Sequence, residues 1–167
     1  MIKVIYGDSR SLLGGSTFSH FFEKMSDTAK QRIMEPKRKD HRAYRLMTYL
    51  MLDALYRREL GAPLPELCFA DHGKPYIENG PAFNVSHDAG YVAIAMTKDF
   101  KDVGIDITPA YPFGTPSTFV CDYVRAEAIM KMTGGGFSDY PRLRDLCAEC
   151  QTALVPLGEI AIGLAYR

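Results

Sequence analysis

The stretch from Leu67 to Ile107 constrains the fold more than any other part of the chain, because its apolar residues recur with a period of two. Turn-forming sequences, among them ENGP, HDAG and KDFKD, separate the apolar runs. This pattern predicts a series of short β-strands joined by tight turns. In the run YVAIAMT nearly every residue is apolar, which is typical of a strand covered on both faces.

The clearest helical pattern lies just before these strands and ends near Gly61, a residue typical of a helix C-terminus. Its apolar positions follow i, i+3, i+4, i+7 spacing: Ala43, Leu46, Met47, Leu50, Met51, Ala54 and Leu55. The opposite face carries Arg38, Arg42 and Arg45. Such a basic stripe is usually a solvated helix face, and it indicates anion binding only if other residues require a phosphate partner.

Four further elements complete the predicted layout. They are a first strand in MIKVIYGDSR, a helix over about 17–34 that ends before Pro36, a helix that begins near Thr115 and Pro116 and ends at 134–136, and a closing strand in EIAIGLAYR. The order of strand, helices, strands, helix and strand predicts an α+β fold.

The overall charge gives no sign of a polyanionic partner, because 20 basic and 20 acidic residues cancel. We therefore expect no nucleic acid among the partners, and any anion must be held by a local cluster. The N-terminus lacks the features of a signal peptide, and no apolar run is long enough to span a bilayer. A cytoplasmic protein that forms one unit over residues 1–167, with no membrane partner, is expected.

Four cysteines are present, and two of them, Cys147 and Cys150, have C-x-x-C spacing. This spacing can bind zinc or support thiol exchange, but a structural zinc site needs four ligands and the sequence has no second such pair. The alternative is two ordinary thiols near a helix end.

Three short motifs bring polar residues to the ends of the predicted strands. Lys74 lies between Gly73 and Pro75 in a turn, where a compact cation suits a phosphate. Ser86 and His87 end the strand FNVSH, where turn capping is the alternative role.

The third motif is VGIDI, in which Val103, Ile105 and Ile107 share one face of a strand. Asp106 lies on the other face, where a charge is costly unless it is paired or binds a cation. About 20 residues later, Glu127 and Lys131 are i, i+4 neighbours on the next predicted helix and can reach one site. An ordinary surface ion pair is the alternative.

These segments together, GKPYI, FNVSHDAGYVAIA, VGIDI and YVRAEAIMKMTGGGF, resemble the 4′-phosphopantetheinyl transferases in the correct order and at fitting separations. The resemblance is to the longer, monomeric type that activates carrier domains of peptide and polyketide synthases. It covers about two-thirds of the chain, from the arginine-bearing helix to Phe137.

The resemblance implies a fold of two similar α+β halves, about 1–105 and 106–167, with the second half shortened. It implies Mg²⁺-dependent transfer of the phosphopantetheine arm of coenzyme A to a serine of an apo acyl or peptidyl carrier protein, with release of 3′,5′-ADP. Coenzyme A and the carrier protein are then the partners, and the protein is a monomer.

The resemblance also assigns roles to individual residues. Asp106 and Glu127 would hold Mg²⁺, with Thr108 as a weaker, neutral ligand, and the catalytic residues would be Glu127, Asp106 and Lys131. The residues that would grip coenzyme A are Arg42, Lys74, Pro75, Ser86, His87 and Lys131. Two carboxylates, waters and substrate phosphates are the ligands that Mg²⁺ prefers.

The sequence departs from the family pattern at four points. Thr108 stands where many members have a third carboxylate, and Tyr123 stands where tryptophan is usual. Ala126 stands where lysine usually precedes the glutamate, and the link between Thr108 and Asp122 is short. These departures support an alternative from another class, a non-catalytic relative that binds coenzyme A or a carrier domain without transfer. An α+β interaction module without a ligand would require every motif to be coincidental.

Overall fold

The computed structural model describes residues 1–70, 73–109, 117–134, 141–158 and 160–167. The N-terminal elements are β1 (Ile2–Asp8), η1 (Ser9–Leu12), α1 (Gly15–Phe22), α2 (Asp27–Met34), α3 (Lys39–Leu60), β2 (Cys68–Phe69), β3 (Pro75–Tyr76), β4 (Ala82–Asp88) and β5 (Tyr91–Thr97). The C-terminal elements are β6 (Val103–Pro109), α4 (Thr118–Thr133), α5 (Leu143–Ala148), β7 (Gln151–Leu157) and β8 (Ile160–Tyr166). The predicted mixture of helices and sheets is confirmed.

The chain builds the same arrangement twice. One antiparallel sheet has the strand order β1-β5-β4 and the other has the order β6-β8-β7. In each half the first strand is followed by a long helix and then by two antiparallel strands. The second of these two strands, β5 or β8, lies in the middle of its sheet. The boundary between the two halves lies in the link at 98–102, between β5 and β6. The predicted boundary, at about 105/106, falls inside β6.

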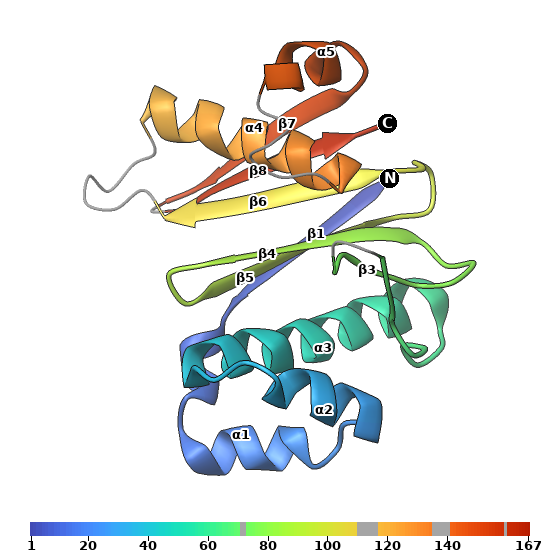
Figure 1. Ribbon diagram of the computed structural model, residues 1–167, viewed down its shortest axis with the longest axis vertical. Coiled ribbons are helices and arrows are strands. Elements are labelled where there is room, and N and C mark those ends of the chain that lie inside the picture. The colour runs from blue at the N-terminus through green and yellow to red at the C-terminus, as the bar shows by residue number, and fades with distance from the viewer. Residues whose placement is uncertain (71–72, 110–116, 135–140, 159) are drawn as a thin grey trace.

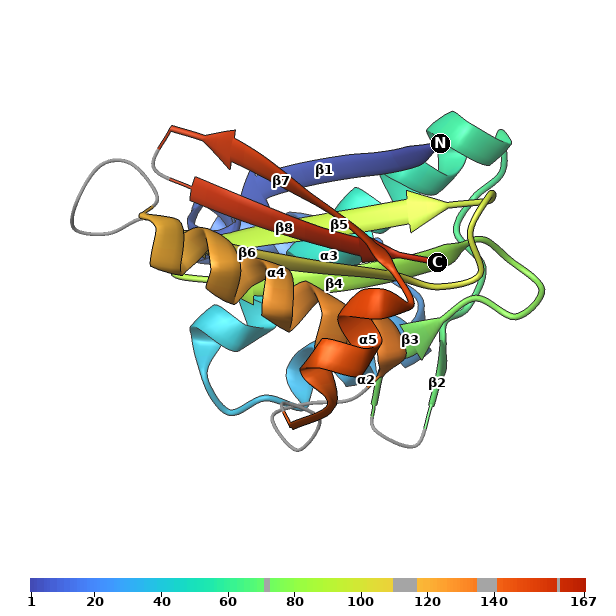
Figure 2. The same cartoon turned by 90° about the horizontal axis from the view of Figure 1, so that it is seen from above.

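The elements form four layers, with helices outside and the two sheets between them (Figure 1). Helices α1 to α3 lie below the first sheet, and α4 and α5 lie above the second; the view from above shows α4 crossing β6 and β8 (Figure 2). The inner faces of the sheets meet in an apolar cluster made of Ala93, Ala95, Val103, Ile105, Ile107, Ile160, Ile162 and Leu164. Strand β5 is therefore covered on both faces, as its sequence predicts.

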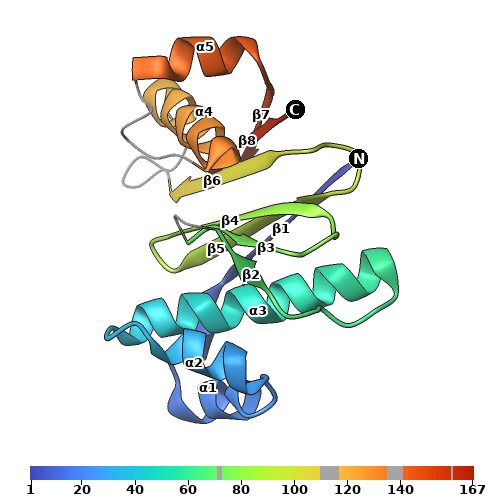
Figure 3. The same ribbon diagram turned by 45° about the vertical axis from the view of Figure 1, so that its right-hand side comes forward.

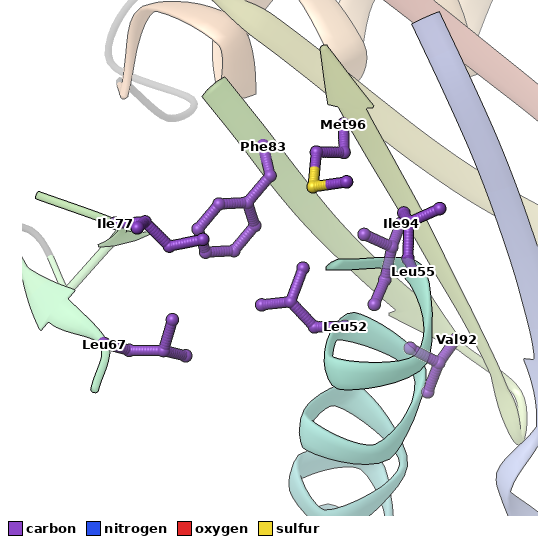
Figure 4. Close-up of a cluster of buried hydrophobic side chains, with 8 residues drawn as sticks. All are labelled: Leu52, Leu55, Leu67, Ile77, Phe83, Val92, Ile94 and Met96. Carbon is purple, nitrogen blue, oxygen red and sulfur yellow. The ribbon is translucent and has the colours of Figure 1, made fainter. Parts of the chain in front are cut away.

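Helix α3 packs on the first sheet through large side chains (Figure 4). Its Leu52 and Leu55 contact the outward face of β5, where Val92, Ile94 and Met96 alternate with the inward alanines. The helix ends at Gly61, which has the left-handed conformation expected of a C-terminal glycine.

Helix α4 packs on the second sheet through its backbone. A Cβ at Gly104 of β6 would collide with the carbonyl oxygen of Ala128, and one at Gly163 of β8 would collide with the backbone of Val124. Only glycine allows this close approach. The helix ends at Gly134, again in the left-handed conformation.

The two halves are joined where the edge strands β4 and β6 meet. Asn84 Oδ1 accepts a hydrogen bond from the backbone N–H of Ile105 at 3.0 Å, and Ser86 Oγ accepts one from Ile107 at 3.4 Å. Side chains of β4 thus take the place of a neighbouring strand along the free edge of β6. We call this junction the seam.

The structure differs from the predicted elements at two described places. The helix expected over 17–34 is two helices, because Ser26 caps a new helix by accepting a hydrogen bond from Ala29 N–H. Strand β7 has no counterpart in the prediction; its Pro156 lowers the strand signal but is tolerated because β7 is an edge strand.

The expected helix start at Thr115 and Pro116 lies outside the described residues, within which α4 begins at Thr118. Among the helices of the described ranges, none is both long and apolar enough to cross a membrane.

Candidate functional site

Asp106 marks the candidate site, at the seam between the two halves. It lies on β6, on the face turned toward α4, and only 5% of its surface is exposed. Gly104, two residues earlier on the same face, lets α4 approach closely enough to cover it. The strand geometry predicted for VGIDI is confirmed, including the separation of Asp106 from the apolar face.

Two elements, β4 and α4, deliver polar side chains to Asp106. From β4, Ser86 Oγ donates a hydrogen bond to Asp106 Oδ1 at 2.8 Å. From α4, Lys131 Nζ donates to the same oxygen at 2.5 Å and to Ser86 Oγ at 2.8 Å. The buried carboxylate is thus paired and hydrogen-bonded, as a buried charge requires.

Glu127 lies one helical turn before Lys131 on α4. Its Oε1 is buried and has no hydrogen-bond partner within the described ranges. Burial raises the pKa of the Glu127 carboxyl, and the negative charge of Asp106 raises it further, while Lys131 offsets part of the effect. The two carboxylates are therefore near enough to repel each other.

Two hydroxyl groups lie at the margin of this pair. Thr108 Oγ1 is 3.5 Å from Asp106 Oδ2, a long contact that leaves this oxygen weakly engaged. Tyr123 lies one turn before Glu127, and burial together with the charges of Glu127 and Asp106 raises the pKa of its phenol. Asp106 Oδ2 thus has only a long contact, and Glu127 Oε1 has no hydrogen-bond partner in the described structure.

These oxygens fit a hard divalent cation. An unpartnered buried carboxylate oxygen beside a second carboxylate is costly without a cation, and Mg²⁺ accepts one or two protein carboxylates plus water and phosphate oxygens. Within the described ranges no three His, Cys, Asp or Glu side chains are grouped as a metal cage. The site thus suits Mg²⁺ better than a metal that needs a full set of protein ligands.

His87 follows Ser86 at the end of β4 and packs among aromatic rings. Its ring stacks on Tyr44 of α3, with centroids 4.5 Å apart, and lies 6.1 Å from the ring of His41. Partial burial lowers the pKa of His87, and the positive charge of Lys131 lowers it further. A neutral imidazole at this position can donate or accept one proton near neutral pH.

A cavity of about 330 Å³ opens beside His87. Arg32, Arg45, Thr48, Tyr49, Leu67, Phe69, Gly73, Pro75, Val85 and His87 line it. The guanidinium of Arg32 lies over the ring of Phe69 at 4.1 Å, and Arg45 pairs with Glu35 at 2.7 Å. Within the described ranges none of the lining residues is acidic, although Arg32 also pairs with Glu35, at 3.2 Å. An anion with a flat, partly apolar group suits this lining if it takes the place of Glu35 on the two arginines.

Of the predicted coenzyme A residues, Pro75 and His87 line this cavity, whereas Arg42 does not. Arg42 Nε instead donates to the carbonyl oxygen of Pro36 at 2.7 Å. Arg45, one turn further along α3, occupies the wall of the cavity. The basic stripe in the sequence contained Arg45, but the position of the β2–β3 hairpin beside α3, seen in Figure 3, could not be read from it.

Lys74 lies at the junction of the halves, but its ammonium is directed at the C-terminus of α4. Lys74 Nζ donates to the carbonyl oxygens of Lys131 at 3.1 Å and Met132 at 3.0 Å. Burial lowers the pKa of Lys74. Lys74 also borders a second cavity, of about 620 Å³, whose lining includes neither Asp106 nor Glu127.

The cysteine pair forms no site with other ligand side chains in the described structure. Cys147 is exposed at the end of α5, Cys150 follows the helix, and both are free thiols. Burial raises the pKa of the Cys150 thiol, which makes it a poorer nucleophile.

No protein-family model matches the sequence, and no curated protein matches it either.

Proposed function

We propose that this protein transfers the 4′-phosphopantetheine arm of coenzyme A to a serine of an apo carrier protein, with Mg²⁺ bound by Asp106 and Glu127. The observation that carries the proposal is the meeting of Asp106, Glu127 and Lys131 at the seam. From the other half, Ser86 bonds to Asp106 and Lys131, and His87 lies near enough to Lys131 for that positive charge to lower the pKa of its ring. Residues spread over about 45 positions of sequence converge in the combination that the family resemblance implies.

The charges of the site match the parts of coenzyme A. The cavity beside His87 is lined by Arg32 and Arg45 and suits the adenosine phosphates, while its aromatic and apolar lining suits the base. The carboxylates of Asp106 and Glu127 suit the cation that accompanies a diphosphate. The diphosphate would then cross the seam near Lys131.

The reaction requires positioning and charge stabilisation more than covalent chemistry. The serine oxygen of the carrier attacks the β-phosphorus, and the bond from that phosphorus to the bridging oxygen of the diphosphate breaks, which releases 3′,5′-ADP. Bound Mg²⁺ would neutralise charge that builds on the phosphate oxygens. Lys131 would hold a phosphate oxygen with its ammonium.

Glu127 is the candidate base for the serine proton. Burial and Asp106 raise the pKa of its carboxyl, which brings its basicity closer to the value that favours proton transfer near neutral pH. The proton leaves the serine hydroxyl as its oxygen bonds to phosphorus, and the carboxylate receives it directly or through one water.

The first turns of α4 offer a surface for the carrier protein. Phe119 is 79% exposed and Tyr123, one turn further, is 41% exposed, while Glu127 follows on the same side of the helix. Large apolar side chains exposed beside a polar site are typical of a protein-binding surface. Since both halves of the site come from one chain, a single copy can form it.

The second candidate function is binding of coenzyme A or a carrier domain without transfer. Lys131 Nζ is only 2.5 Å from Asp106 Oδ1, so an internal cation already neutralises one of the two carboxylates. Thr108 supplies a neutral hydroxyl where a third carboxylate would strengthen the hold on a metal. Both features favour binding over turnover.

A transfer assay separates the two candidates. The protein is incubated with coenzyme A, Mg²⁺ and several apo carrier proteins, and each carrier is examined by mass spectrometry. Addition of one phosphopantetheine group, prevented by EDTA and restored by excess Mg²⁺, supports transfer. Binding of coenzyme A without any modified carrier supports the second candidate, and absence of both binding and transfer contradicts the two proposals together.

A further inference from the structure

We propose that Ser86 is a positioning residue for Asp106 and not a ligand of coenzyme A. This inference rests on the proposed function in one respect, namely that Asp106 binds a cation. The family resemblance would place Ser86 on the nucleotide or its phosphates, whereas its hydrogen bonds lead to another role.

The strong hydrogen bonds of the Ser86 hydroxyl already go to protein groups. A serine hydroxyl offers one proton and two lone pairs. The proton is donated to Asp106 Oδ1 at 2.8 Å, and the oxygen accepts from Lys131 Nζ at 2.8 Å and from Ile107 N–H at 3.4 Å. Ser86 is also only 3% exposed, so a phosphate could reach it only by displacing these partners.

The same hydrogen bonds determine which oxygen of Asp106 is free to bind a cation. Oδ1 accepts from both Ser86 and Lys131, which uses its two lone pairs. Oδ2 has only the 3.5 Å contact with Thr108. Ser86 therefore fixes the carboxylate so that Oδ2 remains for a cation, in the way that outer hydrogen bonds orient metal-binding carboxylates.

Ser86 also ties this orientation to the docking of the two halves, because it lies on β4 and its partners lie on β6 and α4. Asn84, two residues earlier on the same face of β4, makes the neighbouring seam bond to Ile105 N–H, and no hydrogen bond links it to Asp106 in the described structure. Asn84→Ala is thus a matched control that loosens the seam without freeing the carboxylate.

The test has two readouts on the full-length chain. In the first, a double-mutant cycle combines Ser86→Ala with Asp106→Asn, and stability is measured by urea unfolding. We expect the effects of these two substitutions on the free energy of unfolding to be clearly non-additive. The effects of Asn84→Ala and Asp106→Asn are expected to be additive. Ser86→Thr, which keeps the hydroxyl, is expected to retain the coupling. Additive effects of Ser86→Ala and Asp106→Asn would overturn the proposal.

The second readout is binding of Mn²⁺ by electron paramagnetic resonance and of 3′,5′-ADP by calorimetry in metal-free buffer. Ser86→Ala is expected to weaken Mn²⁺ binding about 10- to 100-fold and to leave the affinity for 3′,5′-ADP unchanged. Weaker nucleotide binding with unchanged Mn²⁺ binding would instead make Ser86 a nucleotide ligand. If the wild-type protein binds neither probe, the proposed function fails, and the double-mutant cycle alone decides the role of Ser86.

Discussion

The two halves of the molecule share one strand–helix–hairpin arrangement but pack it differently. In the N-terminal half α3 meets its sheet through large side chains such as Leu52 and Leu55. In the C-terminal half α4 rests directly on Gly104 and Gly163. The same topology can therefore be stabilised either by side-chain interdigitation or by close backbone approach.

The halves also differ in the charged groups that they supply. The N-terminal half supplies Arg32 and Arg45, which line the cavity beside His87 and both pair with Glu35. The C-terminal half supplies the carboxylates of Asp106 and Glu127, which suit a cation. A ligand that carries both phosphates and a divalent cation is the kind of molecule that requires both halves at once.

The sharpest way to separate the two contributions is to remove one charge from each half. Asp106→Asn is expected to lower the transfer rate by about 10³-fold, since a metal-bound phosphate is worth several kcal/mol in the transition state. Arg45→Ala is expected to raise the concentration of coenzyme A needed for half-maximal rate, with a much smaller effect on the maximal rate. The rates are measured on an apo carrier by mass spectrometry. If both variants changed the maximal rate and the half-maximal coenzyme A concentration to the same extent, the two halves would not have separate roles.

The packing difference is tested by a matched pair of glycine substitutions. Gly104→Ala is expected to destabilise the fold by about 3 kcal/mol, because the new Cβ meets the backbone of α4. Gly7→Ala of β1 places a Cβ 3.3 Å from Met51 Sδ, the flexible end of a side chain, and is expected to cost less than about 1 kcal/mol. Thermal unfolding should show a fall of about 10 °C for the first variant. Similar melting temperatures for the two variants would contradict the proposed backbone packing of α4.

A substitution of Lys74 tests whether this cation at the junction stabilises the fold or binds the nucleotide. Because its ammonium binds the last carbonyls of α4, Lys74→Met is expected to cost about 1 kcal/mol of stability. The affinity for 3′,5′-ADP is expected to be unchanged. A large loss of nucleotide affinity with unaltered stability would return Lys74 to the role that the sequence suggested.

The smallest and most specific of the expected effects is the pH-dependent change in stability on substitution of Glu127. The pKa of its carboxyl is raised in the folded protein, so the charged form opposes folding, and stability falls as pH rises from 4.5 through the folded value. In metal-free buffer at pH 7, Glu127→Gln is therefore expected to raise the melting temperature by a few degrees. The difference should vanish near pH 4, where both side chains are neutral. A variant less stable than wild type at pH 7 would show that the carboxylate is well paired.

The sequence predicted those parts of the molecule that depend on local pattern. The period-two strands, the left-handed glycine at the end of α3 and the two faces of VGIDI follow from spacing and residue type alone. The split of the first helix depended on one serine cap, and β7 was hidden by a proline that only an edge strand tolerates.

The site was predictable in its residue types but not in its pairing. The spacing of Glu127 and Lys131 placed both on one face of a helix, as observed. That Ser86 and Lys131 share one oxygen of Asp106 depends on how β4 and α4 pack against β6, which no local pattern encodes. For the same reason the sequence led to Arg42 as the coenzyme A residue of α3, whereas the cavity beside the β2–β3 hairpin is lined by Arg45.

The proposed function depends most directly on the two halves binding one ligand together, and calorimetry of coenzyme A binding with and without Mg²⁺ measures this. We predict that Mg²⁺ tightens binding to the wild-type protein. Glu127→Gln should abolish this gain while keeping the metal-free affinity, and Arg45→Ala should lose metal-free affinity while keeping the gain. If Mg²⁺ leaves wild-type binding unchanged, or still tightens binding to Glu127→Gln, the seam is not the cation site.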